Sequence, residues 1–207
     1  MTNMKMRLIG SPTSPFVRKV RVLALEMNID GRIAFDAVDL GDQTIDLPAH
    51  NPMRKVPTLV LADGSAVFDS AVICDFLLHR FAKASLLPAD EDRRWRSRTT
   101  EAAADGLIEA GLLARYEGQR AAAERSPAWV DKQMGAVARC IDWLDRNEDW
   151  REGPVDVGQI AAGCALGWLA FRFTDHPWRS SHPGLAAWQE RFASRPSMVA
   201  THPAART

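Results

Sequence analysis

The sequence predicts a chain of two parts, an α/β part followed by an all-helical part. Up to about residue 80, short apolar runs typical of strands alternate with runs in which apolar residues recur every three or four positions. An Asp63–Gly64 pair between two strand-like runs is typical of a β-hairpin turn. From residue 90 onward the periodic segments have helical spacing. We therefore expect an α/β domain over residues 1–82, a linker over 83–89 and a helical domain over 90–207.

The α/β part begins with a short strand over residues 5–9, which ends at Gly10. A helix over residues 16–27 follows, with its apolar residues on one face: Phe16, Val20, Leu23 and Met27. Three cations of this segment fall elsewhere on the helix: Arg18, Lys19 and Arg21. The next strand, over residues 33–40, should run parallel to the first because a helix connects them.

The second half of the α/β part is predicted to be an antiparallel hairpin followed by a helix. The strands cover residues 58–61 and 66–68, and Asp69 and Ser70 precede a helical pattern as a cap. Residues 41–50 are either a loop or a short helix. The predicted order is therefore β-α-β and then β-β-α, with one optional helix between them.

The helical part contains four start signals. Asp90 opens one long helical pattern over residues 90–120, and Ser126–Pro127 places an N-cap before a proline at the first helical position. Asp156 and Gln159 have capping-box spacing, which identifies them as folding residues. His182–Pro183 opens the last predicted helix.

Composition excludes several classes of function. The 26 basic and 26 acidic residues leave no net charge to attract nucleic acid or an anionic membrane. Three cysteines lie far apart, without the spacing of a zinc site or a disulfide framework, so we expect no metal centre. The sequence has no apolar stretch long enough to span a bilayer and no leader peptide pattern. We expect a cytoplasmic protein with no nucleic-acid or membrane partner.

Four stretches of the sequence follow one another along the chain: "SPFVRKVRVLALE", "NPMRKVPTLV", "VFDSAVICDFL" and "HPGLAAWQERFASRPSM". They resemble the active-site turn, the cis-proline segment, the acidic–Ser pair and the late helix of the glutathione S-transferase family. The resemblance covers nearly the whole chain. It implies a thioredoxin-like N-terminal domain, a C-terminal helical bundle, glutathione as co-substrate and a homodimer.

The resemblance also places a hydroxyl where the sulfur of glutathione would lie. A thiol with a pKa of about 8.5 is only a few per cent ionised at neutral pH. A helix N-terminus and a hydroxyl donor both favour the thiolate. Ser14 is the first candidate, Ser11 the second and Thr13 a distant third, while the alternative is that Ser14 only caps the helix. Since the resembling omega-like turn has cysteine where this chain has Ser14, disulfide reduction is disfavoured and conjugation is favoured.

The binding residues are also implied by position in the family pattern. A cis bond before Pro57 would leave the backbone of Val56 free to pair with the cysteinyl amide of glutathione. Asp69 would meet the γ-glutamyl ammonium, and Ser70 the carboxylate, although Asp69 is shorter than the usual Glu or Gln. Lys55, with Arg54, could meet the glycyl carboxylate or remain solvated.

The sequence therefore predicts a glutathione S-transferase that attacks a small hydrophobic electrophile. That electrophile should bind the helical domain, where Leu112, Tyr116 and Trp168 are candidate walls. Two alternatives remain open: a glutathione-dependent reductase or dehalogenase, which would use Ser11 or a second thiol, and a non-catalytic interaction protein of the same fold.

Overall fold

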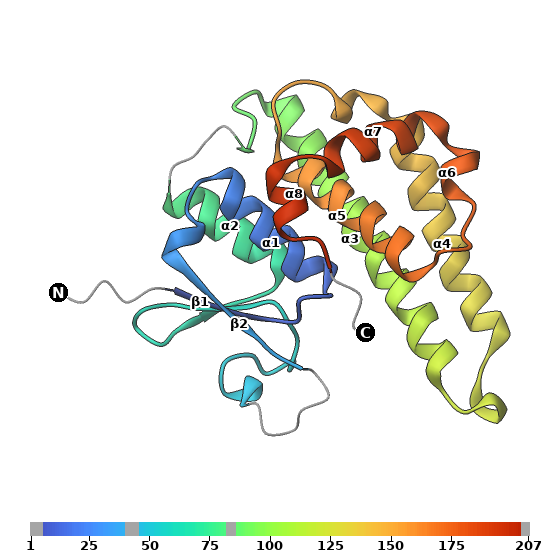
Figure 1. Cartoon of the computed structure of the whole chain (residues 1–207), viewed down its shortest axis with the longest axis horizontal. Helices are drawn as coiled ribbons and strands as arrows, with labels where there is room; N and C mark the ends of the chain where they lie inside the picture. The colour runs from blue at the N-terminus through green and yellow to red at the C-terminus, as the bar shows by residue number, and fades with distance from the viewer. Residues whose placement is uncertain (1–5, 40–45, 82–85, 204–207) are drawn as a thin grey trace. The chain divides into compact units, whose positions relative to one another are not determined.

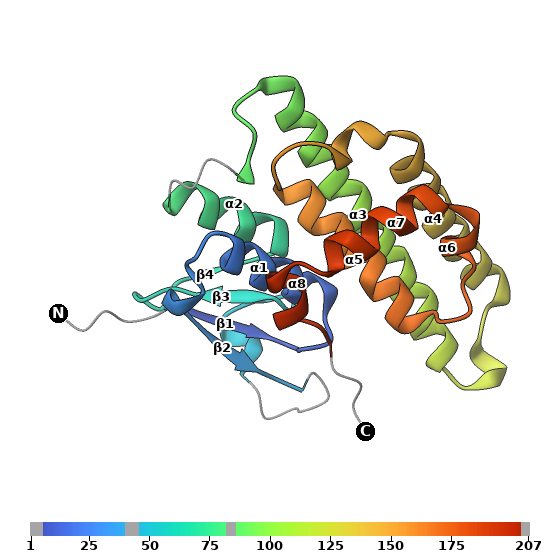
Figure 2. The same cartoon turned by 45° about the horizontal axis from the view of Figure 1, so that its top comes forward.

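The computed structural model describes residues 6–39, 46–81 and 86–203 of the 207-residue chain. These residues form two compact units (Figures 1 and 2). Of the described residues, those up to residue 87 and those over 195–203 form one unit, and residues 88–194 form the other. Residues 195–203, which the sequence pattern assigned to the helical domain, thus group with the α/β unit.

The α/β unit follows the predicted order of elements. These are β1 (Met6–Gly10), α1 (Pro15–Glu26), η1 (Asp30–Arg32), β2 (Ile33–Ala37), η2 (Leu47–Ala49), β3 (Thr58–Val60), β4 (Ala66–Val67), α2 (Ser70–Arg80) and α8 (Pro196–Ala200). Between β2 and β3 the short helix is the 3-10 turn η2, and residues 40–45 of the predicted loop lie outside the described residues.

The four strands form one sheet in the order β2-β1-β3-β4. β1 runs parallel to β2 and antiparallel to β3, and β3 runs antiparallel to β4, as the helix crossover and the hairpin predict. Figure 2 shows α1 and α2 on the same side of this sheet. The thioredoxin-like prediction is confirmed.

Helix α1 is buried on more than its apolar face. Val20 and Leu23 are fully buried as expected, but Arg18 and Lys19 are also 5% and 0% exposed. For Arg18 the cause is α8, which packs against α1 within the same unit. The Arg18 guanidinium donates to the carbonyl oxygen of Met198 at 2.9 Å and to the Thr201 hydroxyl at 3.4 Å. A periodicity argument misses this second buried side because the covering segment is distant in sequence.

A second polar contact, to Glu26, holds residues 195–203 in the α/β unit. Arg195 donates two hydrogen bonds to the Glu26 carboxylate at the end of α1, at 2.8 and 3.0 Å, and Ser197 donates a third. These bonds hold the pKa of Glu26 below its ordinary value, since they favour the charged carboxylate more than burial disfavours it.

The helical unit confirms the predicted helix starts. Its elements are α3 (Glu91–Gln119), η4 (Ala122–Glu124), α4 (Pro127–Arg146), η5 (Glu148–Arg151), α5 (Val157–Arg172), α6 (Trp178–Ser181) and α7 (Pro183–Ala193). Asp90, Ser126 and Asp156 each accept a hydrogen bond from a first-turn backbone N–H of the helix they precede.

The capping box at the start of α5 is only half formed. Asp156 accepts from the Gln159 N–H at 3.0 Å, as predicted, and burial raises the pKa of this carboxyl. The Gln159 side chain instead donates to the carbonyl oxygens of Trp150 and Glu152. The Gln159 side chain therefore stabilises the segment before α5 and does not complete the capping box.

Candidate functional site

The strand register brings the predicted site segments to one edge of the sheet. Ile9 pairs with Thr58 and Leu59 pairs with Val67, so the end of β1, the start of β3 and the end of β4 lie at the same edge. Ser11 follows β1, Val56 precedes β3 and Ser70 follows β4. Both α1 and α2 also begin at this edge, directly after Ser14 and Asp69. Two helix N-termini, with their unpaired N–H groups, thus meet a backbone segment there.

The turn between β1 and α1 presents the hydroxyl candidates. The Ser14 N–H donates to the carbonyl oxygen of Ser11 at 3.0 Å, and the Ser14 Oγ accepts from the Val17 N–H at 3.3 Å. The hydroxyls of Ser11 and Thr13 lie 3.3 Å apart. Gly10 allows the strand to approach α1 this closely, because a Cβ there would lie 2.6 Å from a methyl carbon of Val17.

Ser14 is the N-cap of α1, but capping does not use its proton. A hydroxyl has one donor and two acceptor sites. In the described part of the chain, the Ser14 Oγ accepts a hydrogen bond and donates none. The residue is half-buried, so a ligand that reached the helix end could accept this proton.

A buried cation adds positive charge to the same helix. Arg18 begins the second turn of α1, where its N–H donates to the Ser14 carbonyl oxygen. Its guanidinium is bonded to the neutral acceptors of Met198 and Thr201. Burial and the charge of Arg18 lower the pKa of Arg21 on the next turn. The sequence analysis did not predict the buried charge of Arg18, because the cations of this segment fall outside the apolar face of the helix.

The segment before β3 carries the predicted backbone partner. The Val56–Pro57 bond is cis, as the family resemblance implied. Within the described residues, the N–H and the C=O of Val56 make no hydrogen bond. An extended peptide could therefore pair with this residue as an added strand.

Asn51 organises this segment, and the sequence analysis did not single it out. Its side chain is 1% exposed and donates to the Lys55 carbonyl at 3.0 Å and to the Thr58 hydroxyl at 3.1 Å. Its amide oxygen accepts from the Met53 N–H. The Asn51–Pro52 pair is a turn signal that could have pointed to it. These bonds occupy the Lys55 carbonyl oxygen. The backbone of the next residue, Val56, is left unpaired at the sheet edge.

The start of α2 provides the third segment. The Asp69 Oδ1 accepts from the N–H groups of Ala71 and Val72 at 3.1 and 3.4 Å, so one carboxylate oxygen caps the helix. Its Oδ2 accepts no hydrogen bond from the described residues. Ser70 is 3% exposed and lies at the first position of the helix. A cationic group could bind the free oxygen of the Asp69 carboxylate here, and an anionic group could bind the helix N-terminus.

The remaining candidates differ in exposure. Lys55 and Arg54 are exposed beside Val56. In the helical unit, Tyr116 is 54% exposed and Leu112 is half-buried, whereas Trp168 is 2% exposed and packs edge-on against Phe173. Trp168 is therefore a core residue rather than an open wall.

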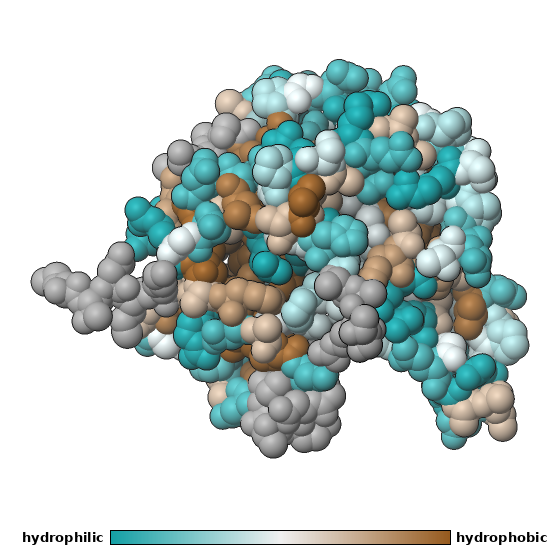
Figure 3. Space-filling model, in the orientation of Figure 1, coloured by the Kyte–Doolittle hydropathy of each residue, from teal (hydrophilic) through white to brown (hydrophobic). Residues whose placement is uncertain are grey.

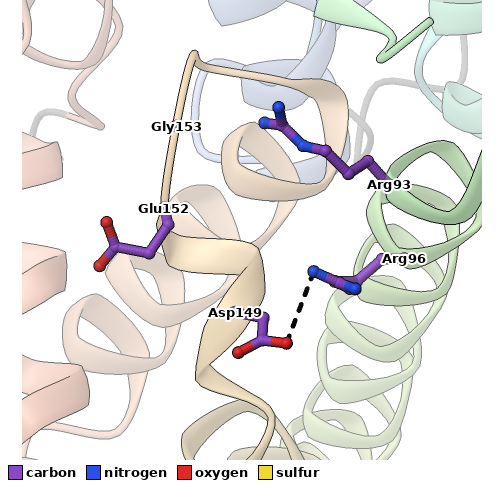
Figure 4. A pocket seen from close by; sticks show the side chains of 5 residues that line it. All are labelled: Arg93, Arg96, Asp149, Glu152 and Gly153. Carbon is purple, nitrogen blue, oxygen red and sulfur yellow. Dashed lines mark ion pairs between the residues drawn. The ribbon is translucent and has the colours of Figure 1, made fainter. Parts of the chain in front are cut away.

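The helical unit also has a hollow of about 310 Å³ between α3 and the segment around η5. Its lining residues come from these two segments: Arg93, Arg96, Asp149, Glu152 and Gly153 (Figure 4). Arg96 and Asp149 form an ion pair across it at 3.5 Å. The charges balance, and both partners are largely exposed, so the hollow indicates no particular ligand. Figure 3 shows apolar residues scattered among hydrophilic ones on the visible face.

Comparison with known proteins identifies the family of this chain. Residues 13–80 match the family model of the glutathione S-transferase N-terminal domain, and residues 127–191 match that of the C-terminal domain. An Escherichia coli K12 protein described as the uncharacterized GST-like protein YibF is 34% identical over 96% of this chain and 98% of its own length. The chain belongs to the glutathione S-transferase family.

Solved structures of other family members are also similar. A glutathione S-transferase from Methylobacillus flagellatus KT, with glutathione bound, has a TM-score of 0.91 and 35% identity, covering 97% of this chain and all of that one. A family member from Pseudomonas fluorescens Pf-5, with bound S-(propanoic acid)-glutathione, has a TM-score of 0.87 and 37% identity over the same shares. Among the described residues, no helix of this family member is both long and apolar enough to cross a bilayer.

Proposed function

We propose that this chain is a glutathione transferase in which Ser14 stabilises the thiolate of glutathione for attack on a small hydrophobic electrophile. The observation that carries the proposal is the meeting of three segments at one sheet edge: the Ser14 turn, the unpaired Val56 backbone and the Asp69–Ser70 helix start. Relatives that match most of the chain hold glutathione in their structures, which supports glutathione as the co-substrate.

The Ser14 turn has the groups that thiolate stabilisation needs. Lowering a thiol pKa by about two units takes roughly 2.7 kcal/mol of preferential interaction with the anion. A hydrogen bond to a charged group contributes about 1.5–3 kcal/mol, and a helix N-terminus contributes about 0.3–1 kcal/mol. The Ser14 proton and the first turn of α1 together reach this magnitude.

The other two segments suit the peptide part of glutathione. The N–H and C=O of Val56 would pair with the cysteinyl residue, next to Pro57. The free Oδ2 of Asp69 would accept from the γ-glutamyl ammonium, and the N-terminus of α2 at Ser70 would bind the γ-glutamyl carboxylate. Lys55 is free to reach the glycyl carboxylate. A homodimer, as the family resemblance implies, belongs to the same proposal.

The cysteines argue against the reductase alternative. Thiol transfer through a mixed disulfide requires an accessible protein thiolate. Cys74 and Cys164 are buried, and Cys140 lies half-buried in α4, where burial raises the pKa of its thiol. None of the three lies in the segments that meet at the sheet edge.

The test is the ultraviolet difference absorbance of bound glutathione thiolate, followed across pH. We expect a thiolate signal that titrates well below the pKa of free glutathione. If saturating glutathione gives no thiolate signal near neutral pH, the transferase proposal loses its basis and a binding role takes its place. If the signal is present but survives Ser14→Ala and is lost in Ser11→Ala, Ser11 is the donor.

A further inference from the structure

Helices α1 and α8 pack against each other within the α/β unit, and two arginines join them (Figures 1 and 2). Arg195 precedes α8 and donates to the Glu26 carboxylate at the end of α1, at 2.8 and 3.0 Å. Arg18 belongs to α1 and donates to the Met198 carbonyl oxygen at 2.9 Å and to the Thr201 hydroxyl at 3.4 Å. The acceptors differ in charge: a carboxylate neutralises Arg195, whereas neutral groups bind Arg18.

The charge of Arg18 is buried and is not neutralised. The residue is 5% exposed, and the Thr201 hydroxyl that binds it donates its own proton to the Ser197 carbonyl oxygen at 2.8 Å. Among the described residues, no carboxylate lies within 4.0 Å of the Arg18 guanidinium. The acids on or next to α1 and the elements packed against it are Glu26, Asp30, Asp69 and Asp75. The basic groups there are Lys19, Arg21, Arg32, His79, Arg80 and Arg195.

The position of this charge does not serve the stability of α1. A cation near a helix N-terminus faces the positive end of the helix dipole. Arg18 is the fourth residue of α1, and the first turn of α1 contains no acid. In α3, by contrast, Glu91 and Asp92 lie in the first turn. The start of α1 is therefore arranged to stabilise an anion that is not part of the helix.

Ser14 lies on the same face of α1 as Arg18. The Arg18 N–H donates to the Ser14 carbonyl oxygen at 3.0 Å, and residues four apart on a helix have Cβ atoms about 5–6 Å from each other. Two unit charges about 10 Å apart, at an effective dielectric constant of about 20, change the pKa of one of them by about one unit. Salt screens a buried charge much less than an exposed one.

We propose that α8 controls the reactivity of the sulfur at Ser14 through Arg18, because it holds the guanidinium buried on neutral acceptors, where its charge favours the thiolate. This inference rests on the proposed transferase function and adds a regulating element to the same site. Arg18 does not touch the sulfur, so it is a positioning residue, and it keeps its proton throughout. Loss of the α8 contact would hydrate the guanidinium and weaken its effect.

A cysteine introduced at position 14 measures this effect without glutathione. In Ser14→Cys, the rate of alkylation by iodoacetamide against pH, assigned to position 14 by mass spectrometry, gives the pKa of the introduced thiol. We expect a value below the usual one of about 8.5, because a helix N-terminus favours the thiolate. Adding Arg18→Met should raise that pKa by about one unit, whereas Arg18→Lys, which keeps the charge, should leave it low.

Two further variants control for net charge and for stability. Arg80→Met removes an exposed cation at the far end of α2 and should leave the pKa of the introduced thiol unchanged. Thr201→Val removes one neutral acceptor of Arg18 and the bond to Ser197, so it should lower the free energy of unfolding. The Met198 carbonyl still holds the guanidinium, so the pKa should change much less than in Arg18→Met.

Four results would overturn the proposal. One is an unchanged pKa of the introduced thiol in Arg18→Met. The others are a rise as large as that in Arg18→Met in Arg18→Lys, in Arg80→Met or in Thr201→Val. These would show, respectively, that the shape of Arg18, the net charge of the protein or the packing of α8 causes the change.

The thiolate of bound glutathione separates this inference from the proposed function. In Arg18→Met, its ultraviolet difference signal should titrate about one unit higher than in the wild type. If the introduced thiol responds to Arg18 but the wild type gives no glutathione thiolate signal, the effect of Arg18 stands and the transferase proposal fails. If the wild type gives this signal and Arg18→Met changes neither titration, the role of Arg18 is wrong and the transferase stands.

Discussion

Two serines of this chain have the same local structure in different units. Ser14 and Ser126 each precede a proline at the first helical position, and each Oγ accepts from the backbone N–H three residues later at 3.3 Å. Ser126 opens α4 in an exposed segment of the helical unit, where its own N–H donates to Glu117. Ser14 lies half-buried in the turn that follows β1, at the sheet edge where Val56, with its unpaired backbone, precedes β3. The same cap thus supplies a binding hydroxyl only where the sheet brings other ligand-binding groups to it.

The largest effect should distinguish the two serines in activity. Ser14→Ala removes the proposed hydrogen bond to the thiolate, so we expect about a 10²-fold loss in kcat/KM, equivalent to roughly 2.7 kcal/mol. Ser126→Ala removes an equivalent cap and should leave kcat/KM unchanged. Steady-state kinetics and the thiolate titration check both variants. Equal losses in the two variants would mean that Ser14 acts only as a cap.

The next effect contrasts two asparagines. Asn51→Ala should destabilise the protein by about 2–3 kcal/mol, because it removes a buried side chain that bonds the Lys55 carbonyl, the Thr58 hydroxyl and the Met53 N–H. Glutathione affinity should fall as the Val56 segment loosens. Asn147→Ala, which loses one exposed bond at the end of α4, should cost less than about 1 kcal/mol. Urea unfolding and glutathione titration measure both, and equal stabilities would contradict the ordering role of Asn51.

Acid should weaken the two units in separate pH windows. Hydrogen bonds from Arg195 lower the pKa of Glu26 in the α/β unit, and burial, followed by the charge of His182, lowers the pKa of His176 in the helical unit. In both cases the unfolded chain binds more protons, so stability falls as pH falls. The His176 contribution begins to be lost as pH falls through 6.5, and the Glu26 contribution only as pH falls through 4.5.

Urea unfolding across pH tests these windows with one variant for each. Glu26→Gln should flatten the dependence below pH 4.5, and His176→Gln should flatten it around pH 6.5. Glu26→Gln should also cost about 1–3 kcal/mol at neutral pH, since it weakens charged hydrogen bonds to Arg195. An unchanged pH profile in either variant would show that the residue does not set its window.

The smallest effect should be common to both serines. Each cap contributes about 1 kcal/mol to helix stability, so Ser14→Ala and Ser126→Ala should lower the free energy of unfolding by similar amounts. Thermal and urea unfolding measure this. A much larger loss in one variant would show that the two caps are not equivalent in the folded protein.

Much of the fold could be predicted from local sequence signals. Ser126–Pro127 and Asp63–Gly64 each act within a few residues, so their helix start and hairpin turn could be identified without tertiary information. The meeting of Ser11 with Val56 at one edge also follows once the antiparallel pairing of β1 and β3 is known. These parts depend on short-range geometry.

The parts that could not be predicted depend on distant contacts. Arg18 is buried because residues near Thr201 return to α1, more than 180 positions later. Gln159 has the spacing of a capping box, but carbonyl groups before α5 take its side chain. Asn51 gives only a turn signal in the sequence, and its network is visible only when Lys55 and Thr58 are placed. Spacing alone does not say which partner a polar side chain finds.

The return of residues 195–203 to the α/β unit has a consequence for how this protein is made. During synthesis, residues 6–81 emerge from the ribosome long before the segment that bonds Arg18 and Glu26. Until Met198 and Thr201 arrive, the guanidinium of Arg18 must remain hydrated or lie buried without those acceptors. The thioredoxin-like unit therefore reaches its final structure only after the whole helical unit has been translated.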